Sequence, residues 1–137
     1  MNTALEIDPK FVKAGNITAK VRDEFKRRNL IGMTVTQVCT EVEDMIRKLG
    51  AEPGFPCGVS INDVTAHYSG ELFNDREITD NSVIKLDLGA HIDGFVADTA
   101  VTISYNPDYY ELTSATEKAL YEAIKNVKKA VGGKLPI

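Results

Sequence analysis

The stretch KLDLGAHIDGFVADTAVTI (residues 85–103) decides the fold class of this 137-residue chain. It covers most of two apolar runs, residues 83–90 and 95–104, whose composition is typical of β-strands. The runs flank Asp93-Gly94, a dipeptide that favours the two-residue turn of a β-hairpin. The sequence therefore predicts an antiparallel pair of strands at this place.

Two aspartates, Asp87 and Asp98, lie within these otherwise apolar runs. With a two-residue turn, Asp87 lies opposite Ala100 and Asp98 lies opposite Gly89. Because strand side chains alternate between faces, both aspartates then point to one side, as diagonal neighbours with Cα atoms about 7–8 Å apart. A four-residue loop preserves this arrangement, whereas a three-residue loop would place the aspartates on opposite faces.

This pair of aspartates has two interpretations. Carboxylates on one face repel each other unless a cation lies between them, and two divalent ions about 3.5–4 Å apart could be held by such a pair. Carboxylate oxygens suit Mn, Co, Fe or Zn, with Gly89 and Ala100 leaving room and Thr99 as a hydrogen-bonding neighbour. The alternative is the solvated face of a one-sided antiparallel sheet. The hairpin alone leaves both interpretations open.

Three helices are predicted outside the hairpin. The first begins at Asp8-Pro9, an N-cap followed by proline at the first helical position. The second follows TVTQ (residues 34–37), which has the form of a capping box, and ends at Gly50. The third begins at Asn106-Pro107. Each helix repeats apolar residues at steps of three and four, which is typical of a helix that buries one face.

Short extended segments are predicted between the second helix and the hairpin, at residues 55–61 and 64–68. The prolines and glycines of this region exclude a long helix. The order of elements is therefore helix, helix, strands, helix. This order predicts an α+β fold, with helices packed on a mainly antiparallel sheet.

The composition indicates a single domain over residues 1–137, with 43% hydrophobic residues and a net charge of -4. A direct nucleic-acid partner is not expected at this charge. Cys39 and Cys57 form no CxxC motif, which argues against a disulfide scaffold and fits a reducing compartment. Since no stretch resembles a signal peptide or a membrane span, we expect a cytoplasmic protein without a membrane partner.

Two motifs together resemble a known family. The segment FPCGVSINDVTAHYSGE (residues 55–71), followed by residues 85–103, resembles type 2 methionine aminopeptidase, in its shorter archaeal form. The resemblance covers nearly the whole chain. It implies the pita-bread fold of dinuclear metallopeptidases. The FP…N…AHY pattern favours methionine aminopeptidase over prolidase and aminopeptidase P, which share that fold.

The resemblance also assigns roles to single residues. Asp87 would bind one metal ion and Asp98 would bridge two divalent ions. His67 would be catalytic, beside the metals and in contact with the substrate amide. A set of residues in or beside one wall of the methionine pocket would bind the substrate: Phe55, Pro56, Asn62 and His67. His91 shares the parity of Asp87 but is expected to be exposed and not to bind metal.

The resemblance implies five protein ligands, of which this chain carries two. Both of its histidines precede Asp98, and the glutamates beyond Asp98 lie on the third helix in a surface-like pattern. The chain is therefore expected to form half of the pita-bread fold plus one helix, as an N-terminal fragment of the catalytic domain. It would belong to an enzyme that removes N-terminal methionine from nascent proteins at the ribosome, and it would be inactive alone.

Two further interpretations stay open. One is a non-catalytic pita-bread binding module, associated with the ribosome or acting as a scaffold. The other is that this chain, as half of the fold, associates with a second copy of itself, because an incomplete sheet would expose apolar surface. The expected partner of the leading interpretation is the missing C-terminal half.

Overall fold

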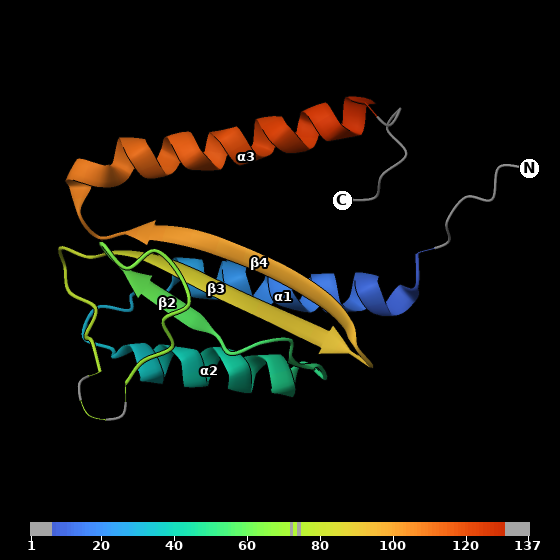
Figure 1. Ribbon diagram of the computed structural model, residues 1–137, viewed down its shortest axis with the longest axis horizontal. Coiled ribbons are helices and arrows are strands. Elements are labelled where there is room, and N and C mark those ends of the chain that lie inside the picture. Colours follow the sequence, from blue (N-terminus) through green and yellow to red (C-terminus); the bar gives the residue numbers. More distant parts are fainter. Residues whose placement is uncertain (1–6, 72, 74, 131–137) are drawn as a thin grey trace, which may run out of the picture.

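The computed structural model describes residues 7–71, 73 and 75–130. The described residues form three α-helices and a sheet, and Figure 1 shows that the third helix stands apart from the first two. Among the described residues, no helix is both long enough and apolar enough to cross a membrane. The α+β class that the sequence predicts, with helices on an antiparallel sheet, is confirmed.

The first two helices begin where the sequence predicts. α1 (Pro9–Arg27) has Asp8 as its N-cap, and the carboxylate accepts a hydrogen bond from the first turn at 2.8 Å. α2 (Val35–Lys48) begins with a complete capping box, in which the side chains of Thr34 and Gln37 each accept the other's backbone N–H. These caps stabilise the helix ends because they satisfy N–H groups that the first turn leaves free.

A four-stranded antiparallel sheet follows α2. β3 (Val83–Ile92) and β4 (Phe95–Ser104) pair along all ten residues of each strand. Since β4 occupies one edge of β3 completely, β1 (Glu52–Pro53) and β2 (Gly58–Ile61) pair in succession with the other edge. The predicted hairpin is confirmed, whereas β1 was not predicted.

The turn between β3 and β4 has the two-residue form on which the placement of the aspartates depends. Asp93 has φ 51° and Gly94 has φ 85°. Two consecutive positive φ values characterise the type I′ turn, whose twist matches that of the flanking strands. Asp98 consequently lies opposite Gly89, and Asp87 lies opposite Ala100, two pairs further along the ladder. The predicted register is confirmed.

The two N-terminal helices cover one face of the sheet. α1 packs against β3 and β4, and α2 packs against β1 and β2. Alternate residues of β3 point into this layer, where they join apolar residues of both helices in a single core. The fully buried side chains of this core include Val21, Phe25, Val38, Val42, Ile84, Leu86 and Leu88. On the other face, alternate residues of β4 remain exposed.

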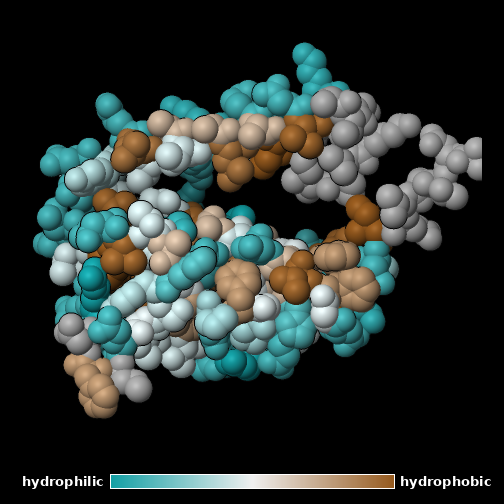
Figure 2. Space-filling model, in the orientation of Figure 1, coloured by the Kyte–Doolittle hydropathy of each residue, from teal (hydrophilic) through white to brown (hydrophobic). Residues whose placement is uncertain are grey.

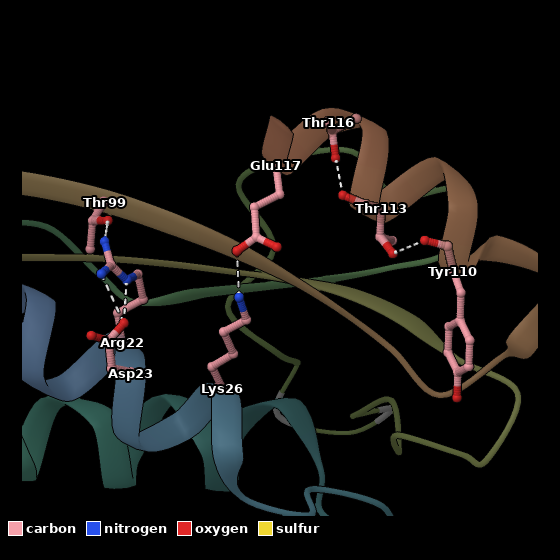
Figure 3. Close-up of polar contacts among 8 residues, drawn as sticks. All are labelled: Arg22, Asp23, Lys26, Thr99, Tyr110, Thr113, Thr116 and Glu117. Carbon is pink, nitrogen blue, oxygen red and sulfur yellow. Dashed lines mark hydrogen bonds and ion pairs between the residues drawn. The ribbon is translucent and has the colours of Figure 1, made fainter. Parts of the chain in front are cut away.

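The third helix lies beside the outer edge of β4. It follows a short 3-10 turn, η1 (Pro107–Tyr109), and runs as α3 (Tyr110–Ala130). An ion pair at 2.6 Å joins Lys26 of α1 to Glu117 of α3 (Figure 3). Between α3, α1 and β4 lies a groove of about 730 Å³. Figure 2 shows apolar side chains along the face of α3 that points toward this groove. The apolar face of the third helix is therefore present but largely uncovered.

The loop between β2 and β3 departs from the prediction. Residues 64–68 form no strand, and β2 begins at Gly58 instead of Phe55. Asn62 has φ 55° and His67 has φ 57°, and both values lie in the left-handed region that a strand excludes. The extended prediction for residues 64–68 is wrong because His67 turns the backbone within the segment and Asn62 turns it two residues before the segment begins.

Candidate metal centre

Asp87 and Asp98 lie on the face of the sheet that α1 and α2 leave uncovered. Leu86 and Leu88 are fully buried beneath the helices, so Asp87 between them points the other way. The Asp87 side chain keeps 30% of its surface exposed, and Asp98 is exposed as well. The register makes the two carboxylates diagonal neighbours, with Cα atoms about 7–8 Å apart.

Lys85 brings a positive charge to the same face. Its Nζ lies 3.8 Å from Asp87 Oδ2, and both side chains are about one-third exposed. A partly exposed pair of this kind contributes little to stability. The contact places a positively charged group beside the Asp87 carboxylate. Sequence reasoning missed Lys85, although its spacing of two residues from Asp87 already places it on the same face.

The two carboxylates are of a chemical type that binds divalent cations, but two protein ligands are too few to complete a metal site. Their oxygens are ligands that hard and borderline metal ions accept. Within the described parts of the chain, however, no group of three or more His, Cys, Asp or Glu side chains could hold a metal ion. His91 points its Nδ1 at the hairpin tip, where it accepts the Gly94 N–H at 3.2 Å. The aspartates would thus supply only part of a coordination sphere.

The glutamates of α3 face other partners. Glu117 pairs with Lys26, and Glu122 pairs with Lys125 of the same helix at 2.6 Å. Glu111 is exposed near the start of α3. Their contacts agree with the surface-like pattern that the sequence shows for this helix.

An interruption of the sheet lies directly beside Asp87. The Gly54 N–H donates to the Gly89 carbonyl at 2.9 Å, and Gly58 pairs with Asp87. Residues 55–57 therefore stand opposite a single residue of β3, Leu88. Extra residues of this kind form a bulge, which turns its side chains out of the regular alternation. We refer to residues 55–57 as the edge bulge.

The edge bulge carries the Phe55 ring over Gly89. A Cβ atom built on Gly89 would overlap this ring, with Cδ1 at 2.9 Å and Cζ at 3.0 Å. Gly89 lies opposite Asp98 and two residues from Asp87, so the ring stands beside both carboxylates. The expectation that Gly89 leaves room for metal ions is wrong, because the Phe55 ring fills that space.

The other predicted substrate-binding residues lie around the edge bulge and β2. Pro56 is exposed on the bulge itself. His67 is exposed, and the next residue, Tyr68, accepts the Val59 N–H at 2.7 Å, which holds the His67 segment against β2. Asn62 is engaged with the backbone of Val83: its N–H donates to the carbonyl and its Oδ1 accepts the N–H, both at 2.9 Å.

Thr99 does not accompany the aspartates. It lies next to Asp98 in the chain and therefore on the opposite face of β4. Its Oγ1 accepts a hydrogen bond from Arg22 Nη1 of α1 at 3.0 Å, and Arg22 also pairs with Asp23 (Figure 3). The expectation that Thr99 supports the metal ligands directly is wrong, because strand alternation turns its hydroxyl toward α1.

The sequence matches a family model over almost all of its described length. The model is that of metallopeptidase family M24, and the match covers residues 10–135. The chain belongs to this family. The match includes the antiparallel hairpin, with one aspartate in each strand, and the two helices that cover the sheet.

Curated relatives of this M24 chain are archaeal proteins named methionine aminopeptidase. Those of Methanocaldococcus jannaschii and Saccharolobus solfataricus are each 46% identical, over 86% and 87% of this chain. The match spans 40% of either relative's length. A relative from Methanothermus fervidus is 37% identical over 89% of this chain and 72% of its own length.

Solved M24 structures show the same fold. A dipeptidase from Pyrococcus horikoshii OT3 superposes with a TM-score of 0.62 at 29% identity, over 70% of this chain and 27% of its own. Aminopeptidase P from E. coli with the inhibitor Pro-Leu gives a TM-score of 0.65 at 22% identity, over 76% of this chain and 24% of its own. This M24 chain therefore has part of the pita-bread fold, as the resemblance implied.

Proposed function

We propose that this chain carries part of the active site of a methionine aminopeptidase. The register that brings Asp87 and Asp98 to one face beside Phe55 carries this proposal. The names of the archaeal relatives support the choice of methionine as the released residue. Two divalent ions, Co, Mn, Fe or Zn, are the proposed cofactors, and when bound they supply an activated water for peptide hydrolysis.

Each predicted site residue has a role in this proposal. Asp87 and Asp98 hold the metal ions, and His67 donates a hydrogen bond to the substrate amide. Phe55, Pro56 and Asn62 line or border the pocket for the methionine side chain. The Phe55 ring beside the carboxylates supports this arrangement most directly. Asn62 borders the pocket and also holds the start of β3, since its amide oxygen accepts the Val83 N–H.

The protein is proposed to be cytoplasmic. The chain by itself is proposed to be inactive. Two carboxylates leave most of a dinuclear coordination sphere to other ligands, so the site needs further protein donors. The proposed substrates are the N-termini of nascent polypeptides at the ribosome. The donors would come from a segment equivalent to the rest of the archaeal relatives, or from a second copy.

An activity assay tests this function. The purified chain is incubated with the peptide Met-Ala-Ser and added Mn or Co, and methionine release is followed. No release is expected from the chain alone. Release is expected after co-expression with the remaining C-terminal part of the M. jannaschii relative, and it should vanish in the Asp98→Asn variant. Robust turnover by the pure chain would contradict the proposed inactivity.

A non-catalytic binding module is the second candidate function. The observation that favours it is the lack, in the described residues, of any third metal ligand near the aspartates. Electron paramagnetic resonance of free Mn in titrations of the chain separates the two candidates. Weak binding that both Asp87→Asn and Asp98→Asn remove, but Asp80→Asn on an exposed loop retains, supports the aminopeptidase. If no Mn binds, even beside the complementary part, the binding module is favoured.

A further inference from the structure

The edge bulge leaves the Cys57 peptide without partners in the sheet. Gly54 and Gly58 on either side pair with β3, but residues 55–57 face only Leu88. Cys57 is 1% exposed, so water does not reach its side chain. Backbone N–H and C=O groups in such a place need hydrogen-bond partners, because an unpaired buried polar group is costly.

Helix α2 supplies both partners from two side chains one turn apart. Cys39 Sγ donates to the Cys57 carbonyl at 3.1 Å. Glu43 Oε1 accepts the Cys57 N–H at 3.2 Å. Cys39 and Glu43 are four residues apart, so they lie on the same face of α2. The carboxylate contact is the stronger of the two, since thiols are weak donors.

Arg47 extends this arrangement to the other side of the edge bulge. Its Nη2 lies 3.1 Å from Glu43 Oε2, and its Nε lies 3.6 Å from Glu52 Oε2 in β1. The Glu43 side chain is the less exposed of these carboxylates, with 26% of its surface accessible. One face of α2 therefore holds the end of the bulge directly and, through Arg47, contacts β1 just before the bulge begins.

We propose that Glu43 is a positioning residue of the candidate active site, which holds the edge bulge so that the Phe55 ring stays over Gly89. This role rests on the proposed function, because it matters for catalysis only if Phe55 lines the substrate pocket. Glu43 does not touch the aspartates or the proposed pocket. It acts through the Cys57 peptide, two residues from the ring that it places.

Fluorine NMR of the whole chain tests this role without metal or substrate. The chain is labelled with 4-fluorophenylalanine at its five phenylalanines, and the Phe55 signal is assigned by its loss in Phe55→Leu. In Glu43→Ala, the Phe55 signal should move toward its position in the unfolded chain. The Cys57 amide should also exchange with solvent about tenfold faster, as expected for the loss of one charged acceptor.

Two variants separate this role from general stability. Glu43→Gln keeps an acceptor oxygen at the same reach, so it should preserve the Phe55 signal and the slow exchange of Cys57. Glu41→Ala removes a carboxylate of the same helix that pairs with Arg28 at 2.7 Å, away from the edge bulge, and should also leave both unchanged. Tm measured for each variant shows whether any change is local.

Several outcomes would overturn the proposal. One is an unchanged Phe55 signal in a folded Glu43→Ala chain, and another is the same change in Glu43→Gln as in Glu43→Ala. If Glu43→Ala does not fold, Glu43→Asp replaces it, because the shorter carboxylate keeps the charge for Arg47 but draws back from Cys57. A wild-type Phe55 signal in Glu43→Asp then contradicts the role. A failed aminopeptidase assay leaves these spectra unaffected, so the two proposals fail separately.

Discussion

Gly89 determines the shape of the candidate metal centre through the atoms that it lacks. It lies in the middle of β3, where a glycine normally weakens a strand because it has no side chain to pack. Here the missing Cβ makes space for the Phe55 ring, which comes from a segment more than thirty residues away. The strand thus lacks a side chain at this position, and the Phe55 ring packs there instead, beside Asp87 and Asp98.

Replacing this glycine should therefore be costly. Gly89→Ala places a methyl group inside the Phe55 ring volume, so we expect the free energy of unfolding to fall by about 1–3 kcal/mol. Urea unfolding followed by circular dichroism measures this change. The matched control is Gly15→Ala in α1, where an added Cβ meets no atom within 4 Å. That variant should be neutral or up to about 1 kcal/mol more stable. Equal destabilisation of both variants would contradict the proposed overlap.

At the scale of single elements, local rules act strongly in α2 and in the hairpin. The capping box at Thr34 and the type I′ turn at Asp93-Gly94 both form as predicted, because each depends on a few adjacent residues. The edge bulge has no such local signal. It forms because β1 and β2 pair with one edge of β3 in different registers, and this mismatch involves residues far apart in the chain.

The capping box provides a test at this scale. Thr34→Ala removes the side-chain acceptor for the Gln37 N–H, and we expect α2 to lose about 1 kcal/mol of stability. Thr40→Ala, at an exposed position inside the same helix, should be neutral or slightly stabilising because alanine is the better helix former. Thermal unfolding of both variants measures the difference. Similar losses of stability in both variants would show that the capping box does not stabilise the start of α2.

At the scale of the whole molecule, the core is one-sided. α1, α2 and the inner face of the sheet bury their apolar side chains together, whereas α3 keeps a groove between itself and β4. Leu120 of α3 is 56% exposed, but Leu30 beside α1 is fully buried. The apolar pattern of the third helix correctly predicts a helix. Its burial could not be predicted from that pattern, because the pattern does not say what will cover the helix.

A matched pair of leucines tests this description. Leu30→Ala should lower the free energy of unfolding by about 2–5 kcal/mol, since it opens a cavity in the core. Leu120→Ala removes the same atoms from a half-exposed place and should change stability by less than about 0.5 kcal/mol. Chemical denaturation of the two variants decides the matter. A large loss in Leu120→Ala would mean that α3 is packed into the core in solution.

The sequence by itself determined the α+β class, the starts of the first two helices, the hairpin register and the common face of Asp87 and Asp98. These follow from turn chemistry, capping and strand alternation, which act over a few residues. The same alternation also placed Thr99 on the opposite face, although its expected role ignored this. Only the tertiary structure decided that Phe55 lies over Gly89 and that α2 holds the edge bulge. Those contacts join segments distant in the chain, so they depend on how the strands and helices pack and not on any local pattern.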